Sequence, residues 1–347
     1  MKRFPHLMVF LLIIALVGGV AFATINAQAQ DNRTVRLGYV PVMIYAPLYV
    51  AVERGYFAEE NITVELTPLQ GGSDSVVQLA AGNFDAAVGG VGAGLLNAAH
   101  QGLEFRIVAP MHTERPPLAS PLVISAKRTN EIKSVADLKG KKVSINATGA
   151  ATEYWVYSAL TKAGLTLDDI TLTTVGFRDV PAALESGAVD ASILGEPLVT
   201  LQKDAGTVAV LADDFVDGIT VTYLYMGLPL LNERPEVAQG FVRAYLKALR
   251  DLQGDGWLTE DTAKIIEKYT NVPADVNLRA NRPYYDPNGG VPLADIEELQ
   301  RYFLERGVLE YAEPVDMSKF IDTSLVEAAL KDLGAFTEPT PEATKSN

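Results

Sequence analysis

The chain has 347 residues, 48% of them hydrophobic, a formal net charge of −14 and no cysteine. A field of this sign argues against partners such as nucleic acid or anionic membrane surfaces, and a chain without cysteine forms no disulfide and carries no lipid on a cysteine. The length is sufficient for one large hydrophobic core or two ordinary ones.

The amino terminus predicts an export signal. Lys2 and Arg3 precede an apolar run at 7–23, and the small-residue pattern AQA at 27–29 provides a cleavage site. We therefore expect a signal peptide at 1–29 and a mature protein in the periplasm or an equivalent extracytoplasmic space. The alternative is an uncleaved membrane anchor, because the apolar run is barely long enough to span a bilayer.

Strands and helices alternate along the rest of the chain, a pattern typical of a mainly parallel sheet covered by helices on both faces. Strands are expected at 35–39, 62–66, 84–88, 105–109, 122–124, 142–145, 170–175, 189–194 and 219–226. Helices are expected from about 48 and at 75–81, 95–101, 152–163, 181–186, 235–252, 259–269, 295–306 and 323–333. The polar composition near the carboxyl terminus predicts a disordered tail at 337–347.

The stretch GYVPVMIYAPLYVAVERGYF at 38–57 links the first strand to the first helix. Pro47 suits a first helical turn, where a missing N–H loses no partner. In an α/β protein such a loop lies at the carboxyl edge of the sheet, where ligands bind, beside the unpaired N–H groups of the helix. Tyr39, Met43 and Tyr45 therefore predict a ligand-facing loop; the alternative is that they pack under a neighbouring loop.

An internal repeat indicates two lobes. LAAGNFDAA at 79–87 recurs as LESGAVDAS at 184–192, and each copy reads as a helix end, a glycine stop, an aspartate turn and a buried strand. Two copies in corresponding places imply two similar lobes. We expect the first lobe to comprise 30–125 and 226–336, and the second to comprise 126–225.

Several motifs now point to one family. They are APLYVAVERGYFAEENITVEL at 46–66, LAAGNFDAAVGG at 79–90, SVADLKGKKVSI at 134–145, LESGAVDASILGEP at 184–197 and ERPEVAQGFVRAYLKAL at 233–249. Together they span most of the mature chain in order. This set resembles the solute-binding proteins of ABC importers, in the branch that takes up sulfonates, nitrate, thiamine pyrimidine precursors and riboflavin.

The resemblance implies an α/β protein with the two-lobed type II periplasmic-binding-protein fold, each lobe a mainly parallel sheet flanked by helices, joined by two crossing strands. A small-molecule ligand would be enclosed between the lobes by hinge motion. The permease and ATPase subunits of the transporter would be its partners, the protein would be a monomer, and it would need no cofactor or metal. Loops at the carboxyl ends of the strands would hold the ligand. This nominates Tyr39, Met43, Tyr45, Gly72, Ser73, Gly90, Val91, Thr148, Gly149, Thr152, Tyr154, Trp155 and Glu196.

The nominated residues favour a vitamin-like heterocycle. Sulfonate and nitrate binders of this family tend to carry Ser or Thr after the first Asp-Ala strand, whereas this chain has GGVGAG at 89–94 with no Arg or Lys nearby. Glu196 would repel an anion at short range, and it can accept paired N–H bonds from an amino- or oxo-heterocycle. The Tyr and Trp side chains suit stacking on a flat ring. Riboflavin is therefore expected ahead of a thiamine pyrimidine precursor, with a sulfonate or nitrate anion as the alternative.

Structural roles compete for some of these residues. Only one of the adjacent Tyr154 and Trp155 can face a cleft from a helix. Glu196 can instead cap the helix that follows it. His100 and His112 are expected on the surface or in loops, and two histidines in a mature chain without cysteine do not predict a metal site.

Catalysis is the alternative of a different class. The yeast synthase that makes the thiamine pyrimidine shares this fold family, so the fold alone does not exclude an enzyme. That chemistry resembles a pyridoxal-dependent cytosolic reaction that needs a lysine and a histidine, and the nominated positions contain neither. We therefore expect a binding protein that is not an enzyme. A sensor subunit that docks on a membrane kinase would use the same cleft.

Overall fold

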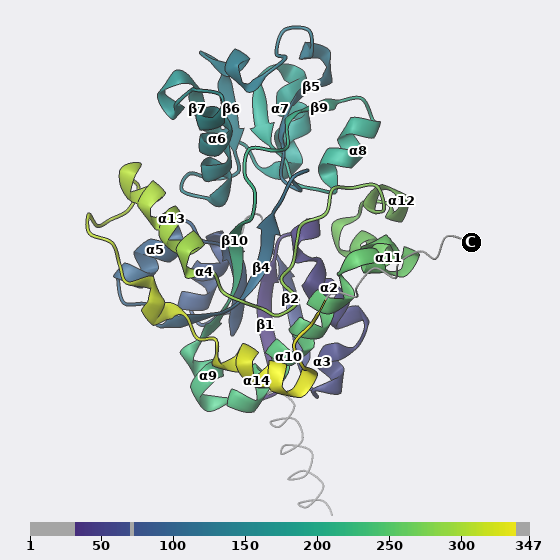
Figure 1. The fold of residues 1–347 in the computed structure, drawn as a ribbon, viewed down its shortest axis with the longest axis vertical. Helices are drawn as coiled ribbons and strands as arrows, with labels where there is room; N and C mark the ends of the chain where they lie inside the picture. The colour runs from purple at the N-terminus through teal and green to yellow at the C-terminus, as the bar shows by residue number, and fades with distance from the viewer. Residues whose placement is uncertain (1–31, 70–72, 338–347) are drawn as a thin grey trace, which may run out of the picture.

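The computed structural model describes residues 32–69 and 73–337. These residues form two α/β lobes, one above the other in Figure 1, with two chain crossings between them. The predicted signal peptide at 1–29 lies outside the described residues, as does nearly all of the predicted tail at 337–347.

Each lobe is built on a five-stranded sheet, and the two sheets have the same arrangement. The first has the order β2 (Thr63–Pro68), β1 (Thr34–Tyr39), β3 (Ala86–Gly90), β10 (Ile219–Gly227) and β4 (Phe105–Glu114). The second has the order β7 (Thr171–Thr174), β6 (Lys142–Ile145), β8 (Ala191–Ile193), β5 (Leu122–Ser125) and β9 (Val208–Ala212). In each sheet one strand, β10 or β5, runs antiparallel to its neighbours, and the other strands share one direction. The expected α/β fold with two mainly parallel sheets is confirmed.

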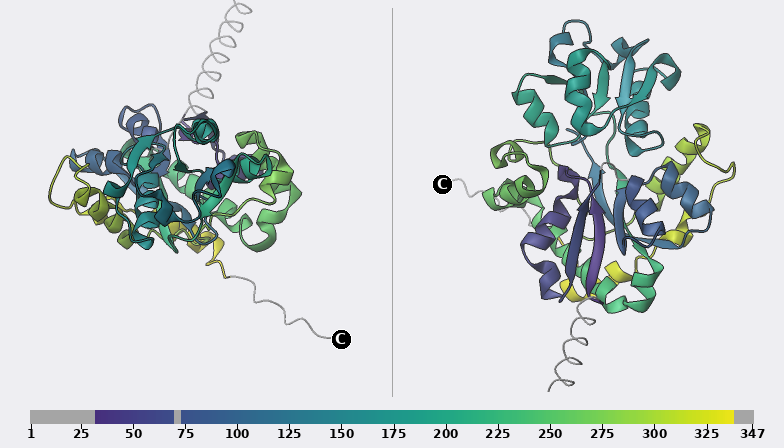
Figure 2. Two further views of the ribbon diagram at one scale, coloured as in Figure 1. Left: turned by 90° about the horizontal axis from the view of Figure 1, so that it is seen from above. Right: turned by 180° about the vertical axis from the view of Figure 1, so that it is seen from behind.

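Helices flank both sheets, as the two views of Figure 2 show. Those of the first lobe are α2 (Ala46–Glu53), α3 (Tyr56–Glu59), α4 (Ser73–Ala80), α5 (Ala93–His100), α9 (Leu228–Glu233), α10 (Pro235–Asp251), α11 (Glu260–Thr270), α12 (Ala274–Asn277), α13 (Leu293–Glu305) and α14 (Ser324–Leu333). Those of the second lobe are α6 (Ala151–Lys162), α7 (Val180–Ser186) and α8 (Leu198–Asp204). The sequence pattern did not indicate α8, α9 and α12, which have only four to seven residues, so their 3.6-residue period is weak. The equally short α7 was indicated because it belongs to the repeated segment.

Helix α10 shows how the apolar pattern builds the first lobe. Val237, Phe241 and Tyr245 recur every four residues along it and are fully buried. The helix begins at Pro235, whose fixed φ angle and missing N–H suit a first turn. Its buried face packs against α2, α3 and α14, and burying each such side chain contributes about 1.5–3 kcal/mol.

The repeated segment makes equivalent contacts in both lobes. Gly82 and Gly187 end their helices with φ of +71° and +75°, a left-handed conformation that glycine adopts without steric penalty. Asp85 then accepts a hydrogen bond from a backbone N–H of β1 at 2.9 Å, and Asp190 accepts one from a backbone N–H of β6 at 2.7 Å. Each aspartate thereby fastens the strand that it precedes to the neighbouring strand of its own sheet.

The strands at the crossings differ from the expected lobe boundaries at 125 and 226. Strand β5 precedes the first boundary but pairs with β8 and β9 in the second sheet. Strand β10 lies almost entirely before the second boundary but pairs with β3 and β4 in the first sheet. A strand beside a crossing can reach either sheet, so long-range pairing and not the local pattern decides its place.

The two crossing segments, 115–121 and 213–218, are hydrogen-bonded to each other. The Leu118 N–H donates to the Asp213 carbonyl at 2.8 Å, and the Gly218 N–H donates to the carbonyl of Glu114, the last residue of β4, at 2.9 Å. The link between the lobes is therefore a paired ribbon of two segments, a suitable hinge for rigid lobes.

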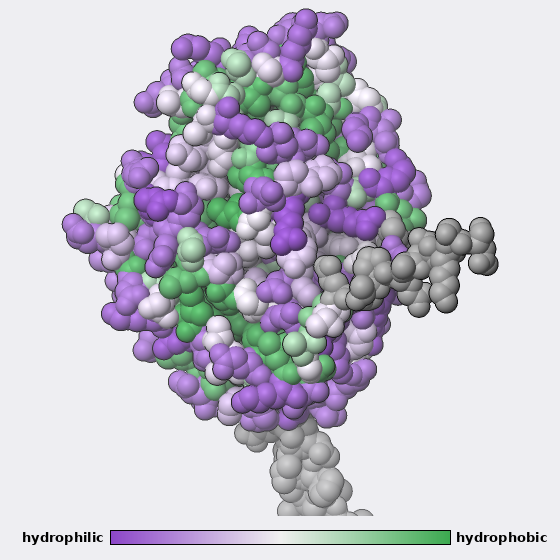
Figure 3. Space-filling view, viewed as in Figure 1, coloured by the Kyte–Doolittle hydropathy of each residue, from purple (hydrophilic) through white to green (hydrophobic). Residues whose placement is uncertain are grey.

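Charged and polar side chains cover most of the face in Figure 3, with smaller apolar areas in both lobes. Within residues 32–69 and 73–337, no helix is long and apolar enough to cross a membrane.

Candidate functional site

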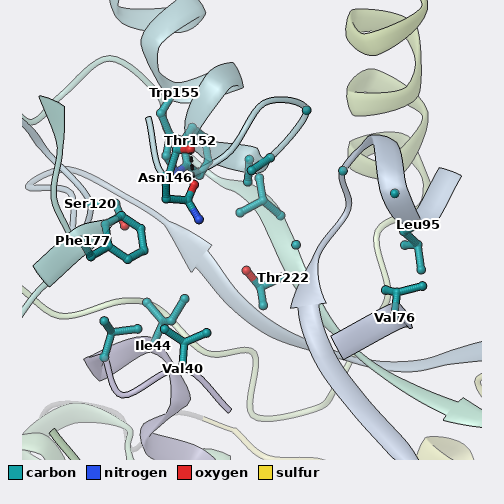
Figure 4. Close-up of a pocket in the computed structure, with 18 of the residues that line it drawn as sticks. Val40, Ile44, Val76, Leu95, Ser120, Asn146, Thr152, Trp155, Phe177 and Thr222 are labelled. Carbon is teal, nitrogen blue, oxygen red and sulfur yellow. Dashed lines mark hydrogen bonds between the residues drawn. The ribbon is translucent and has the colours of Figure 1, made fainter. Parts of the chain in front are cut away.

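A cavity of about 340 Å³ lies between the two lobes (Figure 4). This volume falls in the range of about 300–1,000 Å³ that is typical of small-molecule sites. The first lobe and the crossings line it with Val40, Val42, Ile44, Tyr45, Val76, Val77, Gly90, Gly92, Gly94, Leu95, His112, Ser120, Val221 and Thr222. The second lobe lines it with Asn146, Thr148, Gly149, Ala150, Ala151, Thr152, Trp155 and Phe177.

Buried tyrosines hold the loop that follows β1 in place. The Tyr49 hydroxyl donates to the carbonyls of Val40 and Val42 at 3.0 and 3.1 Å. The Tyr285 hydroxyl donates to the Met43 carbonyl at 3.0 Å. Because these hydroxyls satisfy the loop carbonyls, the loop is fixed against the first lobe and its valine side chains face the cavity.

The second-lobe wall consists of the loop before α6 and the first turns of that helix. Gly149 has φ of +70°, and its N–H donates to the buried Glu153 carboxylate at 2.8 Å. The Thr152 hydroxyl donates to Asn146 Oδ1 at 2.5 Å, and Figure 4 shows the Asn146 amide nitrogen turned toward the cavity. Trp155 lies one turn further along α6 and completes this wall.

The remaining wall is apolar. Phe177 of the second lobe faces Val40 and Ile44 of the first lobe across the cavity in Figure 4. Val77 lies at the edge, and it is 65% exposed, more than any other large apolar side chain that the structure describes. A mainly apolar lining with a few placed polar groups is the usual composition of a small-molecule site.

The structure brings together only part of the nominated set. The residues that line the cavity are Tyr45, Gly90, Thr148, Gly149, Thr152 and Trp155. The described residues that do not line it are Tyr39, Met43, Val91, Tyr154 and Glu196. Gly72 lies outside the described residues, and Ser73 begins α4 without a described side chain. Val91 is fully buried in the core beneath the cleft.

The Glu196 side chain is hydrogen-bonded inside the protein and does not line the cavity. Its side chain accepts hydrogen bonds from the Thr200 N–H at 3.0 Å, the Thr200 hydroxyl at 2.9 Å and the Asn281 N–H at 3.2 Å. Its carbonyl accepts a bond from the Met43 N–H at 3.0 Å. Burial raises the pKa of Glu196, although the bonds from Thr200 and Asn281 act in the opposite direction. The carboxylate thus caps the first turn of α8 and is not available to a heterocycle.

Two nominated tyrosines pack away from the cavity. Tyr39 contacts Tyr49 edge to face with 5.6 Å between ring centroids. Tyr154 contacts Tyr302 of α13 in the same geometry at 5.2 Å. Because successive residues of a helix point about 100° apart, Trp155 faces the cavity while Tyr154 faces α13.

Sequence reasoning missed several cavity residues, namely His112, Ser120, Asn146, Phe177 and Thr222. The expectation for His112 was wrong, because this residue lies on β4 and is only 3% exposed. The one feature of the sequence that indicated a buried or cavity-lining position for His112 was the apolar run directly before it in β4. Ser120, Asn146 and Phe177 follow strands or lie in a crossing, where the local pattern does not distinguish a ligand-facing side chain from an ordinary loop residue. Thr222 lies within β10, where the pattern does not show which face of the strand meets the cavity.

The cavity is nearly free of formal charge. None of the described lining residues is Asp, Glu, Lys or Arg. Arg178 lines a smaller crevice of about 60 Å³ that shares Val40, Val42 and Phe177 with the cavity. Among the residues with described positions, no group of three or more His, Asp or Glu side chains is placed to hold a metal ion.

The lobes touch each other beside the cavity. The Ala93 N–H of the first lobe donates to the Gly149 carbonyl of the second at 2.8 Å. This approach requires glycine at position 92, because a Cβ atom there would lie 2.4 Å from the Gly149 oxygen. The structure therefore has the two lobes closed over the cavity.

Comparisons with known proteins identify sequences and solved structures that resemble this chain. The riboflavin-binding protein RibY of Chloroflexus aurantiacus is 29% identical over 233 residues, which cover 65% of this chain and 64% of that protein. A putative aliphatic sulfonates-binding protein of Escherichia coli is 27% identical over 240 residues, covering 68% and 72%. The alkanesulfonate-binding protein SsuA of Xanthomonas axonopodis pv. citri, bound to MOPS, has a TM-score of 0.70 at 19% identity, covering 84% of this chain and 98% of that chain. A more distant relative, the 4-amino-5-hydroxymethyl-2-methylpyrimidine phosphate synthase of Aspergillus parasiticus, is 23% identical over 288 residues, covering 79% and 80%.

Two α/β lobes of matching topology, closed over a cavity, define the type II fold of periplasmic solute-binding proteins. The NMT1-like family matches residues 28–267, well over half of the chain. This protein belongs to that family, as its motifs predicted. The matched region spans slightly less than two thirds of RibY.

Proposed function

We propose that this protein is the extracytoplasmic substrate-binding subunit of an ABC importer, and that it captures riboflavin for delivery to a membrane permease with its ATPase. The proposal includes export through the signal at 1–29 and a monomeric mature protein. The similarity to RibY and to sulfonate-binding proteins supports the class of function. The cavity supports the choice of ligand.

The observation that carries the ligand proposal is the composition of the cavity. Its walls combine the aromatic rings of Tyr45, Trp155 and Phe177 with aliphatic side chains and contain no described Asp, Glu, Lys or Arg. A flat neutral ring gains from stacking and apolar burial in such a space. The hydroxyl and amide groups around the cavity, such as Asn146 and Thr148, suit the oxo groups of a flavin and the hydroxyls of its sugar chain.

The fluorescence of Trp155 provides the test of this proposal. The chain has only two tryptophans, so the emission of Trp155 can be isolated by one substitution. In a Trp257→Phe variant the emission comes from Trp155 alone, and bound riboflavin should quench it. Trp155→Ala should weaken riboflavin binding up to about tenfold through lost stacking, and further through lost buried area. Trp257 stacks on Tyr285, outside the cavity lining, so Trp257→Phe is the control that loses an indole but keeps a ring against Tyr285 and keeps the affinity. Unquenched Trp155 emission at saturating riboflavin would contradict the proposal.

An anionic ligand is the second candidate, and two features favour it. Arg178 lines the crevice beside the cavity, and α6 begins at the cavity with Ala151 and Thr152 in its lining, where helix N–H groups attract anions. If calorimetry shows that taurine or nitrate binds, that Arg178→Ala abolishes this binding and that riboflavin does not bind, the ligand is an anion. A thiamine pyrimidine precursor fits the same neutral walls, and the same titrations include it.

An enzymatic role has less support. The distant synthase relative shows that catalysis occurs among similar chains. His112 does line the cavity, but no lysine is among the described lining residues. We propose binding without chemical conversion, which predicts that riboflavin recovered from the protein after prolonged incubation is unchanged in mass.

A further inference from the structure

Two polar side chains, one from each lobe, face each other across the mainly apolar cavity. Asn146 directly follows β6 in the second lobe, and Thr222 lies in β10 of the first sheet. Figure 4 shows the Asn146 amide nitrogen and the Thr222 oxygen turned toward the space between them. Neither atom has a hydrogen-bond partner among the described residues, and both keep accessible surface. A ligand that displaces water from this space must offer them polar groups, because an unpaired polar group in a filled apolar cavity is costly.

Thr152 determines which end of the Asn146 amide faces the cavity. The Thr152 hydroxyl lies 2.5 Å from Asn146 Oδ1. Thr152 is only 7% exposed and its hydroxyl bonds to no other described acceptor, so the hydroxyl hydrogen goes to the amide oxygen. A rotated amide would donate to this hydroxyl and leave the hydroxyl hydrogen without an acceptor. The bond therefore directs Asn146 Nδ2, which can only donate, into the cavity.

Both residues belong to fixed parts of the second lobe. Ile145, directly before Asn146, is the last residue of β6, and Thr152 lies in the first turn of α6. Between them, the Gly149 N–H donates to the buried Glu153 carboxylate at 2.8 Å. The amide donor is thus preorganised, which reduces the ordering entropy that opposes ligand binding.

We propose that Asn146 Nδ2, oriented by Thr152, donates a hydrogen bond to an oxo group of the ligand ring, and that Thr222 binds the polar group beside it. This inference rests on the proposed function and names the feature of the ligand that the site selects. The ring of riboflavin carries two oxo groups with an N–H between them. The Thr222 hydroxyl can accept from that N–H or donate to the second oxo group. Asn146 is then a specificity-determining residue, and Thr152 is a positioning residue that acts through it.

The substitution Asn146→Asp isolates the donor. An aspartate keeps an oxygen for the Thr152 hydroxyl and replaces only the amide nitrogen, by a second acceptor. The ligand oxo group would then face a carboxylate oxygen, so we expect riboflavin binding to weaken by about 10-fold or more. Asn83→Asp is the matched control, because it adds the same charge at an exposed residue outside the cavity. It should bind riboflavin like the wild type.

The substitution Thr152→Val tests the positioning role. It removes the hydroxyl and retains the shape of the side chain, so the Asn146 amide can rotate. We expect affinity to fall about 3- to 10-fold, whereas Thr152→Ser should retain it. If Thr152 acts through the amide, Thr152→Val should add nothing in the Asn146→Ala background. Thr161→Val removes a hydroxyl from an exposed position of the same helix and is the control.

Infrared spectroscopy observes the proposed hydrogen bond from the side of the ligand. An oxo group that accepts a hydrogen bond has a lower C=O stretching frequency than one that does not. Riboflavin labelled with ¹³C at its ring carbonyls allows these bands to be separated from those of the protein. We expect one ring C=O band at a higher frequency in the Asn146→Ala complex than in the wild-type complex, and an unchanged spectrum for Thr161→Val.

The outcomes distinguish this inference from the proposed ligand. If riboflavin does not bind but taurine binds and shows the same non-additive cycle, the riboflavin proposal fails and the role of Asn146 stands. Three results would each overturn the role of Asn146: an Asn146→Asp affinity within twofold of the wild type, additive effects of Asn146→Ala and Thr152→Val, or an unchanged C=O band in the Asn146→Ala complex.

Discussion

Closure of the lobes should depend on one ion pair that lies outside the cavity. Glu153 lies in the first turn of α6 in the second lobe and is fully buried, and its carboxylate accepts a hydrogen bond from Arg306 Nε at 2.9 Å. Arg306 follows α13, which is fixed to the first lobe by the Thr220 N–H bond to Asp295 at 2.8 Å. Burial lowers the pKa of Arg306, but the Glu153 carboxylate outweighs this and raises it. The pair therefore joins the two lobes in the closed structure.

The substitution Arg306→Ala removes this partner. Removing one member of a fully buried pair costs about 3–5 kcal/mol. The Arg306 side chain is 34% exposed, and the Gly149 N–H still donates to Glu153, so we expect a smaller penalty of about 1–2 kcal/mol after solvent screening. With the lobes apart, water can hydrate Glu153, so the penalty falls on the closed state. Ligand affinity should then fall about 5- to 30-fold.

Titration calorimetry with riboflavin measures this loss, and small-angle X-ray scattering at saturating ligand measures closure. Lys127→Ala is the matched control, because it also removes one cation, from an exposed pair with Glu185 inside the second lobe. We expect Lys127→Ala to bind like the wild type. Equal affinities for Arg306→Ala, Lys127→Ala and the wild type would show that the Glu153–Arg306 pair does not stabilise closure.

Two further predictions follow from the fold. Gly92→Ala places a Cβ atom 2.4 Å from the Gly149 oxygen, so this variant should keep its melting temperature but fail to compact in scattering when ligand is added; Gly94→Ala, whose Cβ meets nothing within 4 Å, should compact normally. Burial raises the pKa of Asp85, but the side-chain and backbone bonds from Arg36 lower it further, so the folded pKa lies below the unfolded value. The contribution of Asp85 to folding stability is therefore fully present above the unfolded carboxyl pKa of about 3.9. It is lost as the pH falls from that value through the lower folded pKa. Asp85→Asn should lower the free energy of unfolding at pH 7 by about 1–3 kcal/mol and flatten the acid side of the stability profile; an unchanged profile would contradict this.

Much of the architecture could be read from local patterns. Apolar periodicity located the principal helices and strands, because a helix or strand that buries one face needs apolar residues at its own spacing. The repeated Gly–x–x–Asp segment identified two equivalent lobes, and the structure shows why: Gly82 and Gly187 need left-handed backbone, and Asp85 and Asp190 each bind the neighbouring strand. These are local requirements, so they are present in the sequence itself.

The direction in which individual side chains point was decided by the tertiary structure. Tyr154 and Trp155 are adjacent on α6, yet only the second reaches the cavity, because α13 packs against the first. Glu196 faces the start of α8 and the Asn281 N–H, a contact between segments 85 residues apart in the chain. His112 lines the cavity because it lies near the carboxyl end of β4, where the chain crosses to the second lobe. Such contacts depend on long-range packing of lobe against lobe, which neither composition nor periodicity records.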